Sequence, residues 1–350
     1  TLSVTVNGAT YAVVPDSNTG QWSLALGTAT PISGTLGSLE DGQTYQVVVA
    51  ATDAAGNPSS AGVISFTLDT HEPAAPSLTL GAGVSSGATQ GEATQTSGVV
   101  TVNAESGSTV AVTFTDSANH TVTKTITGTG TSQAVTLSST EVGQLQNGTI
   151  TVSAVATDAA GNVSNAGTTT FSLDTVAPTA IDLNANTTGM QTIESQYYRT
   201  GDVGNNKTIL PNIALPTDTD IAQINIAIGG TVDETNDTLV LGTDSKLLNT
   251  TAGSGNAATI GGVSGLSWTY STSKQLTIYK TNGAALAPAE VQAIEQALQF
   301  RTQSNSATQG ERTFSVTHLD AAGNASEKAV TLAVTNVDEV APTFTSSATA

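Results

Sequence analysis

Cysteine is absent from this sequence of 350 residues. The chain can therefore form neither disulfide bonds nor thiolate metal sites. Aromatic residues make up only 4% of the sequence, so its hydrophobic cores must rely on valine, isoleucine, leucine and alanine. Cores of this kind are thin, and we expect domains of modest stability that gain from another type of cross-link.

Basic residues are almost as scarce. Nine lysines and arginines stand against 28 acidic residues, which gives a net charge of −19. This sign disfavours nucleic acids and anionic membranes as partners, and no apolar run is long enough to span a membrane. It favours Ca²⁺, a hard cation that binds carboxylate and carbonyl oxygens. The alternative is that the acidity serves only solubility.

An eight-residue sequence recurs three times and organises the chain. It occupies Thr52–Ser59 and Thr157–Ser164, and it returns with its first residue altered at Leu319–Ser326. Each copy follows an alternating pattern typical of a β-strand, and each precedes a second strand that ends in aspartate. The closing aspartates are Asp69, Asp174 and Asp338. A proline-marked restart comes next, so the unit is strand, Asp-Ala-Ala-Gly-Asn turn, strand, Asp, Pro.

The spacing of the copies predicts an all-β chain of tandem immunoglobulin-like β-sandwiches. Residues 1–70 form a partial sandwich that lacks its first strands, and residues 71–175 form a complete one with about seven strands. Residues 176–340 form an enlarged sandwich with an insertion and one helix, and residues 341–350 begin a next unit. Because the sequence starts in mid-strand without a signal peptide, we expect it to be an internal part of a longer protein.

Local patterns predict three further elements. Trp22–Leu26 alternates as a strand of the first unit, with its tryptophan in the core. Gly229–Asp237 is predicted as a loop rich in glycine and acids. Pro288–Phe300 is predicted as a helix, because proline suits the first helical turn and an apolar stripe follows it that would pack against a sheet.

The recurring turn has two interpretations. In the first it is purely structural: its aspartate accepts hydrogen bonds from backbone amides, and its glycine supplies a positive φ. This explains the aspartate and the glycine, but less well the recurring asparagine and the acid that closes every unit. In the second interpretation the turn takes part in a metal site.

Topology supports the metal site. In a seven-stranded sandwich the turn before the last strand lies at the N-terminal pole, whereas the last strand ends at the C-terminal pole. In a linear array Asp69 therefore meets the turn of Asp158, and Asp174 meets the turn of Asp320. Carboxylates that converge without basic partners repel, and Ca²⁺ would turn this repulsion into a cross-link between units. The candidate ligands are Asp53, Asn57, Asp69, Glu72, Glu105, Asp158, Asn162, Asp174, Asp320, Asn324 and Asp338.

The Thr-Asp-Ala-Ala-Gly-Asn turn, the Phe-Ser/Thr-Leu-Asp-Thr ending and the Ala-Pro-Thr restart resemble the tandem immunoglobulin-like repeats of giant Gram-negative adhesins, which are RTX-type, type I-secreted and biofilm-associated surface proteins. The resemblance covers residues 1–180 and the ends of the third unit. It implies an extracellular protein of the bacterial cell surface that folds in calcium outside the cell. It also implies a monomeric, stiff extender, whose partners are the neighbouring repeats and which holds a binding tip away from the cell. The pair His71-Glu72 departs from the usual apolar-Ala pair at the first restart.

The middle of the third unit departs from a plain extender and suggests an alternative. Its strand–helix–strand run resembles cadherin-like and other enlarged adhesin modules, some of which capture peptides or sugars through calcium. The acids that could hold such an ion are Asp218, Asp220, Asp233, Glu234, Asp237 and Asp244. The candidate contacts to a peptide or glycan on a host or neighbouring cell are Tyr197, Tyr198, Arg199, Asp202, Asp233, Glu234 and Asp237. The plainer interpretation is a solvated acidic loop or a structural calcium.

Exposed aromatic residues separate the two hypotheses. An extender should bury Tyr197, Tyr198 and Trp268, whereas a binding module should present some of them around an acidic pocket.

Catalysis is not expected. Gly83–Gly87 matches the pattern of a nucleophile elbow, but no strand–elbow–helix context surrounds it. The histidines His71, His120 and His318 occupy different strand and linker contexts and form no metal-binding pattern.

Overall fold

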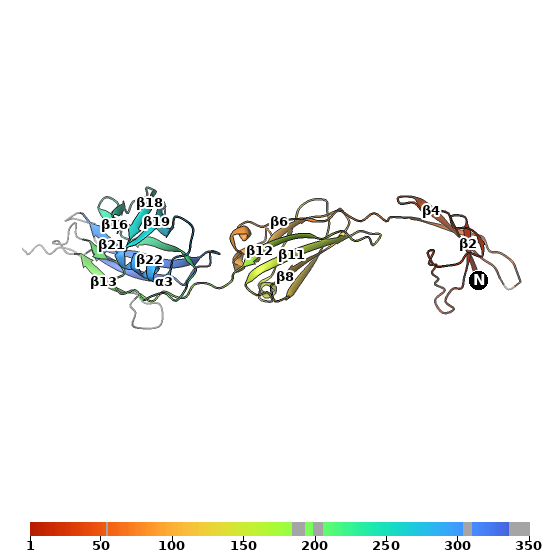
Figure 1. The fold of residues 1–350 in the computed structure, drawn as a ribbon, viewed down its shortest axis with the longest axis horizontal. Helices are drawn as coiled ribbons and strands as arrows, with labels where there is room; N and C mark the ends of the chain where they lie inside the picture. The colour runs from red at the N-terminus through yellow and green to blue at the C-terminus, as the bar shows by residue number, and fades with distance from the viewer. Residues whose placement is uncertain (54, 184–192, 199–205, 304–309, 336–350) are drawn as a thin grey trace, which may run out of the picture.

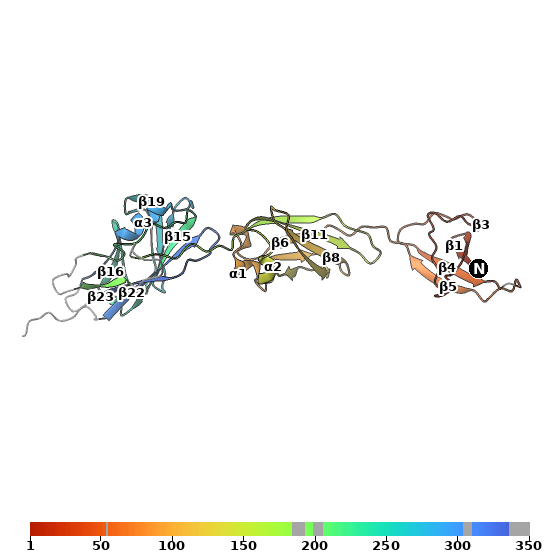
Figure 2. The same ribbon diagram turned by 90° about the horizontal axis from the view of Figure 1, so that it is seen from below.

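The computed structural model describes residues 1–53, 55–183, 193–198, 206–303 and 310–335. Three bodies follow one another in a line, and Figures 1 and 2 show this arrangement in two perpendicular views. We call them the first, second and third units. Antiparallel sheets dominate the described residues and the helices among them are short, so the prediction of an all-β fold is confirmed. No described helix is both long enough and apolar enough to cross a membrane.

The second unit is a sandwich of two antiparallel sheets. Its strands bury alternate side chains: along β11 Ile150, Val152 and Ala154 are buried, whereas the residues between them are exposed or half-buried. This two-residue period places the apolar residues of both sheets in one shared core. One sheet, of order β10-β7-β6, contains Gln133–Val135, Val100–Asn103 and Ser77–Leu80, and the other, of order β12-β11-β8-β9, contains Gly167–Leu173, Gly148–Thr157, Thr109–Thr115 and Thr121–Thr127.

Short helical turns join the strands of the second unit. They are η1 (Val84–Ser86), α1 (Gln90–Ala93) and α2 (Ser139–Val142). A capping box begins each α-helical turn: Thr89 accepts from the backbone of Glu92, and Ser138 accepts from that of Glu141, while each glutamate accepts a bond in return.

The first unit consists of a single sheet, so the prediction of a strand at Trp22–Leu26 is wrong. Trp22 is half-buried and packs beside Val4 and Val47 on one face of the sheet, but its segment pairs with no strand. The reason is visible in the second unit, where β10 pairs with β7; residues 1–70 contain no counterpart of β6 and β7. The sheet, of order β3-β2-β1-β4-β5, contains Ser33–Gly34, Ala9–Val13, Leu2–Val6, Thr44–Ala51 and Gly62–Thr67.

The third unit has a seven-stranded and a four-stranded sheet, which enclose the biggest core among the described residues. Its long sheet is antiparallel except at one edge, where β13 runs parallel to β23. That sheet, of order β13-β23-β22-β15-β20-β19-β18, contains Ile193–Tyr198, Ala329–Thr335, Gly310–Asp320, Ile221–Gly230, Gln275–Lys280, Val263–Tyr270 and Gly253–Ile260. The other, of order β14-β21-β16-β17, contains Lys207–Thr208, Leu298–Thr302, Asp237–Leu241 and Asp244–Leu247.

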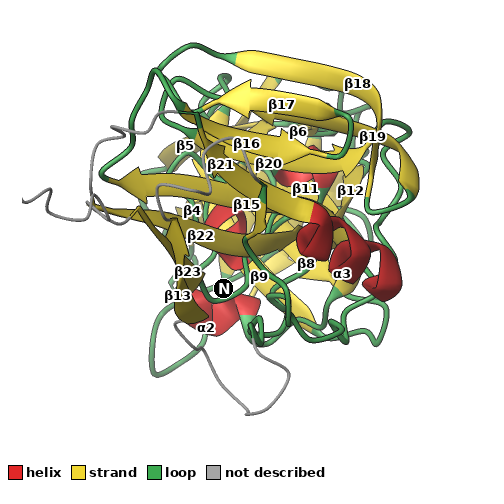
Figure 3. Ribbon diagram, turned by 90° about the vertical axis from the view of Figure 1, so that its left-hand side faces the viewer, coloured by secondary structure: helices red, strands yellow, loops and turns green. Residues whose placement is uncertain are grey.

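The helix α3 (Pro288–Ala297) contacts β18 and β19, and Figure 3 shows it at the margin of the sheets in the unit nearest the viewer. Its N-terminus is where the sequence predicts it, but its predicted C-terminus at Phe300 is wrong. The chain becomes extended at Leu298 and continues as β21. Leu298 and Phe300 are buried at a two-residue spacing, so packing into the sheet outweighs their helical propensity.

Candidate functional site

The Asp-Ala-Ala-Gly-Asn turn closes on itself through its aspartate. Asp158 Oδ1 accepts from the backbone N of Gly161 at 2.7 Å and of Asn162 at 2.9 Å, and its Oδ2 accepts from Asn162 Nδ2 at 2.8 Å. Gly161 has a φ of 97°, which favours glycine. The bond from the asparagine side chain is the largest cause of a lowered pKa of Asp158. The aspartate, the glycine and the asparagine of the turn therefore each have a structural role, although the sequence left the asparagine unexplained.

The other two copies keep this geometry. Asn57 Nδ2 donates to Asp53 Oδ2 at 2.8 Å, and Asn324 Nδ2 donates to Asp320 Oδ2 at 2.9 Å. The Asn57 side chain is again the first cause of a lowered pKa of Asp53. The copies are thus three instances of one local structure, and they differ chiefly in what lies against them.

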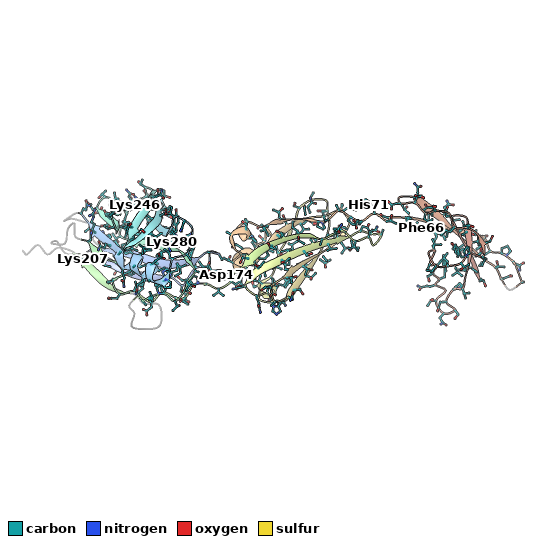
Figure 4. The ribbon with its side chains drawn as sticks, in the orientation of Figure 1. Phe66, His71, Asp174, Lys207, Lys246 and Lys280 are labelled. Atoms are coloured by element: carbon teal, nitrogen blue, oxygen red, sulfur yellow. The ribbon has the colours of Figure 1, made fainter. Side chains whose placement is uncertain are left out.

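At the first junction the second unit contacts the closing residue of the first unit. Asn162 Nδ2 lies 3.2 Å from the carbonyl oxygen of Asp69 and 3.4 Å from its Oδ1. Asn165 Nδ2 lies 3.4 Å from Glu72 Oε1. The structure therefore brings Asp69 beside the turn of Asp158, with Glu72 close by, as the topology argument predicts. His71 belongs to the linker here (Figure 4).

The second junction repeats this contact and draws three acids together. Asn324 Nδ2 donates to the carbonyl oxygen of Asp174 at 3.0 Å. One carboxylate oxygen each from Asp174, Asp220 and Asp320 lie within 4.8 Å of one another. Figure 4 places Asp174 in the connection between the second and third units. Asp220 was expected among the acids of a separate ligand site, but it reaches the junction because the next residue, Ile221, pairs with Asp320.

The second junction is also the more closely packed of the two. A Cβ atom placed on Gly87, in the second unit, would lie 3.3 Å from the Cα of Ala322, in the third unit's turn. The exposure of the turn's aspartate also differs among the three copies. Asp53 is exposed and Asp158 half-buried, whereas Asp320 is only 3% exposed. Burial of the turn's aspartate thus increases from the first unit to the third.

A side chain that the sequence analysis missed ties down the start of each linker. Asp41 Oδ1 accepts from Thr70 N at 2.6 Å and from Thr70 Oγ1 at 2.9 Å. In the second unit Asn147 Oδ1 accepts from Thr175 N at 3.2 Å and from Thr175 Oγ1 at 3.0 Å. Asp41 and Asn147 are each followed by a glycine, and the strand that leads to the recurring turn begins at that glycine or just after it. That shared position was the signal by which they could have been found.

Four candidate metal ligands are not found at these junctions: Asp53 and Asn57 of the first unit's turn, Glu105 and Asp338. Glu105 lies in the loop before β8, at the same pole as the Asp158 turn because Thr109 pairs with Thr157. Its exposed carboxylate makes no hydrogen bond to a residue of another unit in the described part of the chain. Asp338 lies outside the described residues.

The structure gives the acids of the predicted 229–237 loop other partners. Asp237 is fully buried at the start of β16, and Arg312 Nε donates to its Oδ2 at 2.8 Å. Burial raises the pKa of Asp237, and the bond from Arg312 opposes that rise. Glu234 pairs with Lys274 at 2.6 Å, and Asp233 accepts from Thr235. The prediction of an open acidic site at Asp237 is wrong, because Arg312 reaches it from β22 of the other sheet.

The remaining acids of that alternative are also engaged. Trp268 is only 5% exposed, as expected of an extender, and its Nε1 donates to Asp244 Oδ2 at 2.9 Å. Asp218 Oδ2 accepts from Thr179 N at 2.9 Å. Tyr197 and Tyr198 belong to β13, where only the backbone is described, and Arg199 and Asp202 lie outside the described residues.

The sequence features with catalytic patterns have structural roles. Residues 84–86 of the elbow-like sequence form a 3₁₀ turn. His120 Nδ1 lies 2.8 Å from Asp116 Oδ2, and His318 Nε2 lies 2.8 Å from Glu295 Oε1. The second pair is buried between α3 and β22, beside a pocket of about 350 Å³.

No family model matches the sequence, and neither does any curated protein. Among solved structures, it is similar to a tetra-tandem repeat in the extending region of a large adhesion protein, with 17% identity and a TM-score of 0.27. That match covers 96% of this chain and 66% of the other. A 1.5-MDa bacterial ice-binding adhesin is similar with 16% identity, a TM-score of 0.27, and coverage of 96% and 86%.

Fibronectin(III)-like modules of Clostridium thermocellum CbhA are similar with 12% identity and a TM-score of 0.28, over 77% of this chain and 100% of theirs. Identities and TM-scores this low carry no argument about function. The function must therefore be argued from the junctions.

Proposed function

We propose that this chain is an extender segment of a bacterial cell-surface adhesin, in which Ca²⁺ bridges consecutive units and stiffens the array. The observation that carries the proposal is the meeting of Asp174, from one unit, with Asp220 and Asp320, from the next, within 4.8 Å. None of the three has a lysine or arginine partner among the described residues. A cation is the missing partner that would make such a junction favourable.

The geometry and the chemistry of these donors suit calcium. Ca²⁺ binds six to eight oxygens at about 2.3–2.6 Å, so two oxygens of one shell are at most about 5 Å apart. The three carboxylate oxygens meet that limit. Asp320 Oδ2 accepts one bond from Asn324 and keeps lone pairs for an ion, while Asp220 is exposed. Carboxylates with no sulfur or imidazole donor also favour a hard cation over a transition metal.

The first junction supports the same role with fewer groups. Asp69 and Asp158 both approach Asn162, and Glu72 lies next to Asn165. The carboxylates are less enclosed here than at the second junction. Calcium at this position would bind more weakly, because fewer charged ligands are fixed in place.

The arrangement of the units suits an extender. Three units follow one another in a line, and residues at the junctions make the contacts between them. On the strength of the motif resemblance, we include in the proposal an extracellular, cell-surface location and the RTX-type, type I-secreted, biofilm-associated class. The alternative of a peptide- or glycan-binding third unit has no observation in its favour, since its acids Glu234 and Asp237 are engaged in ion pairs.

The test compares the full chain in calcium and in chelator. Small-angle scattering should show a longer maximum dimension in calcium, and calorimetry should show a higher melting temperature, because an ion that binds only the native junction stabilises it by mass action. Magnesium at the same concentration is the control, since its shell is smaller and more rigid. Identical scattering and melting in calcium and chelator would refute the proposal.

A further inference from the structure

Three asparagines in this chain are followed by glycine: Asn7, Asn147 and Asn282. A side-chain amide is open to attack by the next backbone nitrogen when that residue has no Cβ in the way. The three sites share this feature and differ in the hydrogen bonds around the amide. Asn147 is the one that sits at a junction between units.

The amide of Asn147 is held in an activating environment. Its Oδ1 accepts from both Thr175 N, at 3.2 Å, and Thr175 Oγ1, at 3.0 Å. Its Nδ2 lies 3.4 Å from Asp174 Oδ1. Two donors on a carbonyl oxygen are the arrangement that stabilises a developing oxyanion. At the other two sites the described residues supply no such pair: Asn7 donates from Nδ2 to Ser38 O, and Asn282 Oδ1 accepts from Ala284 N.

Gly148, which supplies the nucleophile, is the first residue of β11 and pairs there with Leu173, so its nitrogen is freed when this end of the ladder opens. It has a φ of 119°, a conformation that favours glycine, and apart from its chain neighbours no described residue has an atom within 4 Å of where its Cβ would be. Asn147 itself is exposed to solvent, so water can reach the side chain.

We propose that Asn147 is a self-modifying residue, which deamidates through its own backbone and faster than the other two Asn-Gly sites. The Gly148 nitrogen loses its proton to a solvent base and bonds to Cγ of Asn147, forming a tetrahedral oxyanion held by Thr175. The Cγ–Nδ2 bond then breaks, and ammonia leaves with a proton from solvent. The resulting succinimide adds water and opens to aspartate or isoaspartate. The net reaction consumes one water and releases one ammonia, with no oxidation or reduction.

The product changes the charge of the second junction. A carboxylate at position 147 replaces the amide donor that faces Asp174, so it adds a negative charge beside the three acids. The repeat tolerates an acid here, because Asp41 holds Thr70 in the same way in the first unit. This consequence rests on the proposed function: deamidation would make the junction more dependent on calcium, since one more carboxylate must be neutralised.

The test is to incubate the folded full chain at mildly alkaline pH and follow each Asn-Gly site by peptide mass spectrometry. Conversion should be fastest at Asn147. In Thr175→Val, which keeps the backbone donor and loses the hydroxyl, conversion at Asn147 should slow by up to about tenfold, less than the loss in a closed enzyme site. Thr175→Ser should restore the rate, and neither variant should alter Asn7 or Asn282.

Other outcomes would overturn the inference. It fails if Asn147 stays intact while Asn7 or Asn282 converts. It also fails if Thr175→Val speeds conversion, because the hydrogen bonds would then protect the amide rather than activate it. Thermal melts of each variant identify any that are misfolded, and Asn147→Gln, whose longer side chain disfavours the ring closure, provides an unreactive folded reference. The mass readout does not involve calcium, so a failure of the calcium proposal leaves this test unaffected.

Discussion

Substitution of Asp220 by asparagine should stabilise the third unit in chelator and reduce the stabilisation that calcium adds. Asp220 is the best probe of the three acids because it is exposed and accepts no hydrogen bond from a described residue, so its loss leaves the fold intact. Asp174 and Asp320, in contrast, also hold backbone groups of the linker and the turn.

Without calcium the substitution should stabilise. Two unit charges 4.8 Å apart repel by about 1 kcal/mol in a water-like dielectric and by about 3 kcal/mol at an effective dielectric of 20. The lower figure is appropriate because Asp220 is exposed. Asp220→Asn removes two of the three repulsive pairs, so it should raise the free energy of unfolding by about 2 kcal/mol in chelator. For a unit of this size that is a rise in melting temperature of roughly 4–8 °C.

With calcium the same substitution should lose most of this advantage over the unmodified chain. At a free concentration a hundredfold above the dissociation constant, the ion contributes about 2.7 kcal/mol. If the loss of one charged ligand weakens binding tenfold, about 1.4 kcal/mol remains. The rise in melting temperature on adding calcium should fall from roughly 5–11 °C to roughly 3–6 °C.

The assay is differential scanning calorimetry of the full chain in chelator and in a calcium titration. Glu311→Gln is the matched control, since it removes one exposed acid at the other end of the strand that carries Asp320. It should leave the calcium response unchanged. The reasoning is refuted if Asp220→Asn fails to raise melting in chelator, if calcium raises its melting as much as that of the unmodified chain, or if it cannot be distinguished from Glu311→Gln.

Three further predictions follow from the same structure. Asp174→Ala should leave both units folded but give a bent or broader particle in calcium by small-angle scattering; a particle as extended as the unmodified chain would contradict this. Arg312→Met leaves Asp237 buried without its partner and should cost about 3–5 kcal/mol in denaturant unfolding, much of which Asp237→Leu in the same chain should restore. The bonds from Lys124, first, and from Ser138 lower the pKa of Glu141 from 4.5 to about 2, so the second unit should lose stability as pH falls through that range. Glu141→Gln should flatten that loss in pH-dependent melts, and an unchanged slope would count against the pair.

The repeat was enough to predict how units meet. A turn before the last strand and an acid after it must lie at opposite poles of a sandwich, so Asp174 and Asp320 could be paired without coordinates. The sequence offered no such rule for Asp220. It lies in the enlarged part of the third unit, and its place depends on the pairing of Ile221 with a residue almost a hundred positions away.

Burial and partners were the properties that the local sequence could not predict. Asp233, Glu234 and Asp237 follow two glycines and resemble a solvated loop, yet Asp237 is the first residue of a buried strand. Its partner Arg312 comes from a distant strand, so only the tertiary structure brings the charges together. The segment at Trp22 shows the reverse case: its alternation is real, but a strand also requires a neighbour to pair with.

The three copies of the turn separate local folding from junction formation. Asp53, Asp158 and Asp320 each accept the same asparagine bond at 2.8–2.9 Å, although the first is exposed and the last is buried. The turn therefore folds without help from a neighbour. It presents the asparagine amide and one carboxylate already oriented, so docking of the preceding unit costs little further ordering of this segment. What the neighbour adds is its closing acid, and with it the repulsion that a cation would relieve. A purely structural turn would explain why the asparagine amide and the carboxylate are already oriented, but it would not require an acid at the end of every unit.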